Sequence, residues 1–203
     1  MFEILYRITD NTEDLKTFNE NTFDMGGDIL GFFSINVNGY HYGRYHNYPL
    51  QLGEHDWERI TDWLLALMRV YQELNRSGYV LLDVVDSYNS WIEFRKTQDT
   101  VEINLLAAEK EDGTTALRLT PLEKFEYDKW YIQLVKSGEI HSELVDRRNE
   151  TVKLSRIRSE LLRKASQYLE ELREVNHKLL GNKKITELYA FILEMSRDNS
   201  SDM

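Results

Sequence analysis

Residues 31–48, with the sequence GFFSINVNGYHYGRYHNY, concentrate the side chains of this protein that are best suited to binding chemistry. They hold two phenylalanines, four tyrosines and the histidines His41 and His46. Aromatic rings anchor partner proteins, and imidazoles can hold a metal ion. On one continuous strand, however, two histidines five residues apart point to opposite faces and do not meet at one ion. The pattern therefore favours contact with a partner, and we predict no metal ligands.

The remaining polar residues form no recognisable catalytic pattern. The chain has no cysteine, which excludes thiolate nucleophiles, thiolate metal ligands and disulfides. A nucleophile elbow, a phosphate-binding glycine-rich loop, a His-Glu-x-x-His pair and a dinucleotide fingerprint are all absent from the sequence. Carboxylates gather at Asp83 and Asp86, and again at residues 109–112, where they suit charged strand ends better than acid/base chemistry. We therefore expect no enzyme activity, no catalytic residues and no cofactor. An enzyme or small-ligand-binding domain with an unrecognised site is the alternative.

The negative charge of the chain is confined to its first part. The net charge is −10, with 20 acidic and 10 basic residues in 1–122 and 15 of each in 123–203. Six of the acids lie between residues 10 and 28, where Lys16 is the only basic residue. Such a surface repels nucleic acid and attracts cationic partners. We predict that a cationic protein partner, and not nucleic acid, contacts Asp10, Glu13, Asp14, Asp24 and Asp28, together with Tyr45, His46 and Tyr48 after the hairpin.

The elements that must position these residues are visible in the periodicity of the first half. Residues 2–9 alternate between apolar and other side chains, which is typical of a strand with one buried face. Residues 30–37 and 40–45 are two strand-like runs joined by Asn38-Gly39, which predicts a two-residue hairpin with a type I′ turn. Residues 55–76 carry apolar side chains at helical spacing, so we predict a helix there, capped by Asp56.

The second half changes from strands to helices near residue 122. Residues 79–86, 90–98, 100–109 and 114–121 are four strand-like runs with short connections, which predicts an antiparallel meander. Residues 154–179 have apolar side chains about 3.6 residues apart, and 183–197 form a shorter helical stretch. We therefore predict an α+β fold with one antiparallel meander sheet of six or seven strands, one helix packed across it and a C-terminal helical layer. Residues 1–122 would form the acidic sheet region, and 123–203 a helical region packed on the same domain.

The compartment is inferred from what the sequence lacks. The first ten residues read as a strand and not as a signal peptide, and no apolar run approaches the eighteen residues of a membrane span. The absence of cysteine fits a reducing compartment. We expect a soluble, cytoplasmic protein that does not act on a membrane.

The order of these segments resembles a known group of proteins. GFFSINVNGYHYGRY is followed by YPLQLGEHDWERITDWLLALMRVYQEL, by acidic strands and by PLEKFEYDKWYIQLVKSGEIHSEL. Over roughly residues 28–145 this is similar to immunity proteins of bacterial contact-dependent inhibition and other polymorphic toxin systems. In several of these families an Asn-Gly hairpin with a second glycine nearby, here Asn38, Gly39 and Gly43, precedes a Trp-containing helix. The resemblance implies a cytoplasmic protein that binds a cognate toxin domain, often a cationic nuclease, and blocks its active site without catalysis.

Overall fold

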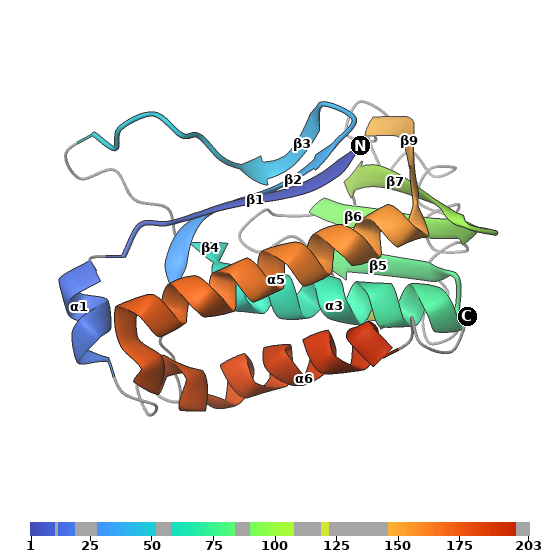
Figure 1. Cartoon of the computed structure of the whole chain (residues 1–203). Helices are drawn as coiled ribbons and strands as arrows, with labels where there is room; N and C mark the ends of the chain where they lie inside the picture. Colours follow the sequence, from blue (N-terminus) through green and yellow to red (C-terminus); the bar gives the residue numbers. More distant parts are fainter. Residues whose placement is uncertain are drawn as a thin grey trace.

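The computed structural model has two antiparallel sheets and a set of helices packed against them (Figure 1). It describes residues 1–10, 12–18, 28–51, 58–83, 90–107, 119–121 and 146–197. The predicted α+β class is confirmed. The single meander of six or seven strands is wrong, because the described strands divide into a four-stranded and a five-stranded sheet.

The first sheet, sheet A, is formed by the N-terminal strands. Its strands are β1 (Phe2–Ile8), β2 (Leu30–Val37), β3 (Tyr40–Arg44) and β4 (Glu58–Arg59), with β2 between β1 and β3 and β4 also paired to β2. The hairpin between β2 and β3 turns at Asn38 and Gly39, whose φ values of 51° and 95° are both positive as a type I′ turn requires. The strand predicted over residues 2–9, which the structure shows as Phe2–Ile8, and the predicted hairpin are therefore confirmed.

The second sheet, sheet B, has the strand order β8-β5-β6-β7-β9. Its strands are β5 (Tyr79–Asp83), β6 (Ser90–Thr97), β7 (Thr100–Ala107), β8 (Leu119–Pro121) and β9 (Asp146–Lys153). Only β5, β6 and β7 form a meander. The fourth predicted strand, β8, returns to the opposite edge and pairs with β5, where Leu81 faces Thr120.

The strand beside β7 comes from a region that the sequence pattern assigned to helices. β9 has the sequence DRRNETVK, which contains one aliphatic residue, Val152, and so shows no alternation of apolar and polar side chains. It pairs with β7, with Val101 opposite Val152, and the register shifts between Ile103 and Leu105. A polar edge strand of this kind is stabilised by backbone pairing with its neighbour and carries little hydrophobic signal of its own.

The described residues include five helical elements. They are α1 (Thr12–Thr17), α3 (Ile60–Arg76), α5 (Leu154–Asn176), the 3₁₀ helix η3 (His177–Gly181) and α6 (Lys183–Arg197). Of these, α3 and α5 contact the strands, and the others pack on helices. The predicted helix 55–76 begins later than expected, because Glu58 and Arg59 pair with β2 as strand β4. Residues 52–57, which include the predicted cap Asp56, lie outside the described residues.

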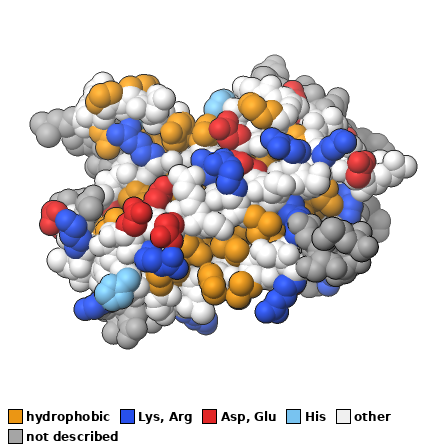
Figure 2. All heavy atoms as spheres, viewed as in Figure 1, with side chains coloured by type: hydrophobic (Ala, Val, Ile, Leu, Met, Phe, Trp, Pro, Cys, Tyr) orange, Lys and Arg blue, Asp and Glu red, His pale blue; other side chains and the backbone are white. Residues whose placement is uncertain are grey.

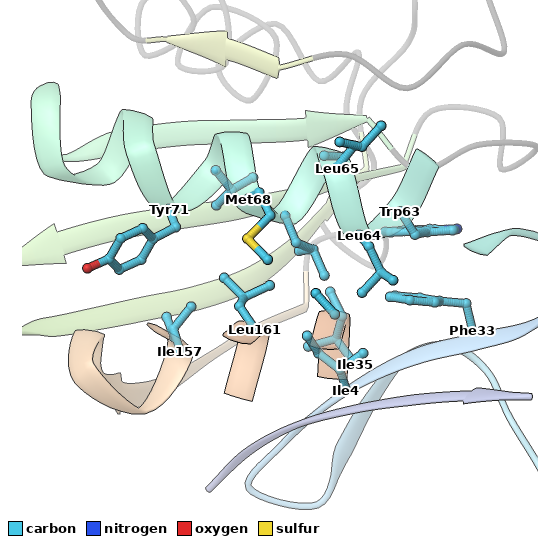
Figure 3. Close-up of a cluster of buried hydrophobic side chains, with 14 of the residues drawn as sticks. Ile4, Phe33, Ile35, Trp63, Leu64, Leu65, Met68, Tyr71, Ile157 and Leu161 are labelled. Atoms are coloured by element: carbon cyan, nitrogen blue, oxygen red, sulfur yellow. The ribbon is translucent and has the colours of Figure 1, made fainter. Parts of the chain in front are cut away.

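Helix α3 is the centre of the molecule. It contacts β2 of sheet A and β5, β6 and β8 of sheet B, while α5 and α6 cover its other side (Figure 1). Its side chains are therefore buried almost all round, and they include Trp63, Leu64 and Met68 (Figure 3). The Trp63 indole is stacked on Phe33 of β2 with ring centroids 5.0 Å apart. One apolar cluster joins these residues to Ile157 and Leu161 of α5.

The two sheets are also linked directly at the β2–β3 hairpin. The Tyr42 hydroxyl of β3 donates a hydrogen bond to the Ile103 carbonyl of β7, 3.2 Å away. The Asn38 amide of the turn donates to Glu150 Oε2 of β9 at 2.6 Å and to the Thr151 carbonyl at 3.3 Å. These contacts fix the hairpin, and the segment that follows β3, relative to sheet B. In the described residues no helix is both long and apolar enough to cross a membrane.

Candidate partner-binding surface

Three aromatic rings form a stack between the buried sheet and the surface. Phe32 of β2 is fully buried, and the His46 ring lies 4.5 Å from it between ring centroids. The Tyr48 ring stacks on His46 at 3.8 Å with an angle of 11° between the ring planes, whereas the Phe32 and His46 planes are tilted by 58°. Tyr48 is 58% exposed, whereas His46 is buried. The stack therefore presents one aromatic ring to solvent and holds it on two rings that are already packed, which limits the entropy lost on binding.

Two arginines fix this stack from the strands beside it. Arg7 of β1 donates a hydrogen bond from Nη1 to the Tyr48 carbonyl at 2.7 Å, so the segment after β3 runs back along β1. The Arg44 guanidinium lies over the Phe32 ring, 5.4 Å from its centroid. Arg7 thus holds the backbone of Tyr48, and Arg44 contacts the ring of Phe32. Arg7 and Arg44 were not among the predicted contacts, because their positions against Tyr48 and Phe32 are set by the pairing of separate strands and not by a local pattern.

A glycine at position 43 permits this arrangement. Gly43 has φ +99°, a conformation that side chains rarely adopt, and a Cβ there would lie 2.5 Å from the Phe33 carbonyl oxygen. At this point β3 lies close to β2. The chain then continues to Tyr45, which is half-buried, and to His46. Gly43 therefore has a structural role, and its substitution would displace the aromatic stack.

The two hairpin histidines do not share a site. His41 Nδ1 lies 3.2 Å from the Ser34 hydroxyl, whereas His46 contacts Phe32 and stacks on Tyr48. Within the described parts of the chain, no group of three or more histidine and carboxylate side chains could hold a metal ion. Of the carboxylate clusters, only Asp83 lies among the described residues, at the end of β5; Asp86 and residues 109–112 lie outside them.

Two of the predicted acidic contacts are exposed on α1. Glu13 and Asp14 lie in its first turn, and Glu13 pairs with Lys16 at 2.7 Å. The helix is held to α5 by Asn176, whose side-chain amide donates to the carbonyls of Leu15 and Phe18. In Figure 1, α1 and the segment after β3 extend toward the same end of the molecule. A partner that covers this end would meet Glu13 and Asp14 as well as Tyr48.

Of the other predicted acidic contacts, Asp10 is half-buried and Asp28 is buried. The Asp10 carboxylate is half-buried and accepts a hydrogen bond from the Leu30 amide at 2.6 Å, and burial raises the pKa of this group. Asp28, which we expected to face the partner, is instead buried and accepts from the Ile29 amide at 2.7 Å. Both carboxylates satisfy backbone amides at the start of β2. Asp24 lies outside the described residues.

Asp28 belongs to a buried polar cluster that the sequence analysis missed. Lys184 of α6 lies 3.1 Å from Asp28 Oδ2 and 2.7 Å from Asp62 Oδ1 of α3. Beside them the Thr61 and Tyr168 hydroxyls are 2.7 Å apart, and both residues are fully buried. The cluster's members lie far apart in the chain, so no local pattern indicated it. Because its charged and hydroxyl groups bond to one another, the cluster links α3, α5 and α6 and is not arranged for a ligand.

Charges elsewhere on this side of the molecule are mixed. Figure 2 shows acidic and basic side chains interspersed over α5, with hydrophobic side chains gathered toward α6. On α5 several of these charges form pairs along the helix, such as Arg163 with Glu160 and Arg173 with Glu170. The Arg173–Glu170 pair is exposed on both sides and contributes little stability, whereas the Glu160 side chain is only 12% exposed. Alternating charges of this kind create no single-signed field. Among the described residues predicted as acidic contacts, Glu13 and Asp14 of α1 are the exposed ones.

Comparisons with protein-family models, with curated proteins and with solved structures return no match for this chain. Its function must be argued from its own residues.

Proposed function

We propose that this protein is an immunity protein that binds a cognate toxin domain and neutralises it by covering a cationic active site. The observation that carries the proposal is the Tyr48 ring, 58% exposed and stacked on the buried His46. Tyrosines held in this way are typical of the residues that dominate protein–protein affinity, since little conformational freedom remains to be lost. The arrangement suits recognition by contact and requires no catalytic group.

The acidic excess of residues 1–122 supports a cationic partner. Exposed carboxylates on α1, at Glu13 and Asp14, would attract such a partner before contact and raise its association rate. The sequence resemblance to immunity proteins points in the same direction. In this proposal Tyr48 contributes mainly to the lifetime of the complex, and the α1 carboxylates contribute mainly to its rate of formation.

The experiment takes the product of the gene immediately upstream of this one as the toxin candidate. The C-terminal domain of the neighbouring upstream gene product is expressed in cells with and without this chain, and growth is measured. We expect growth arrest without the chain and protection with it. The purified pair should then form a complex, and Tyr48→Ala should weaken its affinity about ten-fold or more, whereas Tyr189→Ala should leave it unchanged. Tyr189 is a matched control because it is also a tyrosine, is 51% exposed and lies on α6, away from the stack.

The charge contribution is tested in the same complex. The double variant Glu13→Lys, Asp14→Lys should slow association about ten-fold at low salt, and the difference should shrink as salt rises because screening acts over ~8–10 Å. Failure of the wild-type chain to protect, or equal affinities for Tyr48→Ala and Tyr189→Ala, would contradict the proposal.

A further inference from the structure

Helix α6 presents large apolar side chains to solvent. Tyr189 is 51% exposed and Leu193 is 41% exposed, and they lie about one helical turn apart. With the exposed Thr186, one turn earlier, they form a line that we call the α6 stripe. Among the described residues, the other exposed large hydrophobic side chains are Tyr48 of the aromatic stack and Met1. Figure 2 shows hydrophobic side chains gathered toward α6. A cluster of exposed apolar groups marks a surface that another molecule covers.

The acidic side chains of α6 face another element. Glu187 pairs with Arg69 of α3 at 2.6 Å. Glu194 accepts a hydrogen bond from the side-chain amide of Gln72, also of α3, at 3.1 Å. Both carboxylates therefore lie on the side of α6 that faces α3, and the residues of the α6 stripe carry no charge. A partner that lies along the stripe meets an uncharged surface.

Basic side chains lie at both ends of the α6 stripe. Lys183 at the start of α6 and Arg197 at its end are both exposed. Arg158 of α5 also reaches the far end, where it donates to the Met195 carbonyl. Residues 154–197 hold nine basic and six acidic residues, although the whole chain has a net charge of −10. The surface around the stripe is therefore positive, and it favours acidic groups at both ends of the molecule that covers it.

A second copy of this chain does not match these charges. In a two-fold contact between two α6 helices, Tyr189 lies opposite Leu193 of the other copy, and Arg197 then comes close to Lys183 of the other copy. Like charges meet at both ends of such a contact. The acidic helix α1 of another copy does not fit either, because it has six residues and its one large apolar side chain, Leu15, is 1% exposed.

We propose that the α6 stripe binds an amphipathic helix of another protein, with apolar side chains along one face and carboxylates near both ends. A helix packs well along another helix, because side chains three and four residues apart form ridges that fit between those of its neighbour. α6 has 15 residues and is about 22 Å long, which suits a partner helix of similar length. The charge of this partner is opposite to that of the proposed toxin, so the inference does not rest on the proposed function.

The experiment titrates the full chain with a designed helical peptide and follows the backbone amide resonances by NMR. The peptide has about 15 residues, with leucines along one face and glutamates at both ends. We expect saturable shifts confined to residues 183–197 and to the part of α5 beside them. A second peptide, with lysines in place of the glutamates, should bind at least about ten-fold more weakly, because its ends meet Lys183 and Arg197.

Variants of the chain test the apolar contact. Tyr189→Ala and Leu193→Ala should each weaken binding of the glutamate peptide about five-fold or more. Tyr48→Ala should change it by less than about two-fold. Tyr48 is the matched control because it is also a tyrosine, is 58% exposed and lies in the aromatic stack, away from α6.

A second set of variants tests the charges. Arg197→Glu should weaken binding of the glutamate peptide and strengthen binding of the lysine peptide. Arg156→Glu should change neither by more than about two-fold. Arg156 is a suitable control because it is exposed on α5 and stands two residues from Arg158, which places it on the side of α5 away from α6.

Shifts that do not saturate, equal binding of the two peptides, or equal effects of Tyr189→Ala and Tyr48→Ala would overturn the proposal. Sedimentation that shows a dimer of the chain alone, lost in Leu193→Ala, would overturn it in favour of a second copy. Binding to vesicles of anionic lipid, lost in the same variant, would overturn it in favour of a membrane. None of these tests uses the toxin, so failure of the peptide to bind leaves the proposed function standing, and failure of protection leaves this inference standing.

Discussion

Lys184 Nζ lies 3.1 Å from Asp28 Oδ2, and this ion pair joins the first turn of α6 to the chain just before β2. The Asp28 side chain is 1% exposed and the Lys184 side chain 33% exposed, so the pair is largely shielded from water. Lys184 also pairs with Asp62 of α3, and its amide donates to the Asn182 side chain that caps α6. One lysine therefore compensates two carboxylates where the C-terminal helix meets the rest of the fold.

Removal of this lysine should destabilise the protein. In Lys184→Met, Asp28 remains buried beside Asp62 without a cation, and we expect a loss of about 2–3 kcal/mol in the free energy of unfolding. Urea unfolding followed by circular dichroism measures it. The neighbouring exposed Lys183→Met is the control and should change stability by less than about 0.5 kcal/mol. Equal effects of the two variants would show that the ion pair contributes nothing specific.

The same carboxylate should make stability depend on pH in an unusual direction. Burial, and then repulsion by Asp62, raise the pKa of Asp28 above its ordinary value of 3.8, while Lys184 and Thr61 act in the opposite direction. The folded chain thus binds the Asp28 proton more tightly than the unfolded chain does. The contribution of this group to stability is therefore greatest below pH 3.8 and falls as the pH rises through the folded-state pKa.

The variant Asp28→Asn isolates this titration, because all other groups remain in both proteins. We expect the unfolding free energy of the wild type minus that of Asp28→Asn to fall as the pH rises above 3.8, the ordinary pKa of an aspartate. Urea unfolding at several pH values gives both curves. A difference that is constant or that rises with pH would show that Asp28 keeps an ordinary or lowered pKa.

The stacked pair Trp63 and Phe33 should account for much of the contact between α3 and sheet A. Trp63 is 1% exposed, and its indole Nε1 donates to Glu58. Trp63→Ala should cost about 3–5 kcal/mol, since it removes the largest buried side chain of the cluster and leaves a cavity. Trp63→Phe keeps an aromatic ring against Phe33 and should cost clearly less. Thermal and urea unfolding of both variants test this order, and a loss of a few tenths of a kcal/mol for Trp63→Ala would contradict the packing.

Two substitutions of Asn38 separate the contribution of its backbone conformation to stability from the contribution of its side-chain hydrogen bonds. Asn38→Gly keeps the positive φ of the turn but loses the hydrogen bonds to Glu150 and the Thr151 carbonyl, so we expect a loss of about 0.5–1 kcal/mol. Asn38→Ala loses the same bonds and must also hold φ 51°, which should add about 1 kcal/mol. Unfolding measurements compare the two. If they are equally stable, the left-handed conformation contributes nothing to the cost.

The sequence by itself determined the elements whose signals are local. Alternation predicted β1, Asn38-Gly39 predicted the hairpin, and the helical spacing of residues 154–179 and 183–197 predicted α5 and α6. Each of these signals lies within a few residues, because turn geometry and side-chain direction depend on neighbours in the chain. The expected contact of Tyr48 with a partner also came from a local signal, the aromatic-rich sequence of residues 31–48. It stays a prediction.

Tertiary structure alone decided which strands are neighbours and which polar groups are buried. β8 pairs with β5 and not with β7, whose edge is taken by the polar strand β9. Asp28 was assigned to the surface from the density of acids around it, yet Lys184, 156 residues away, compensates it inside the fold. Strand order and the pairing of buried charges depend on segments that meet only after folding, and no spacing within one segment encodes them.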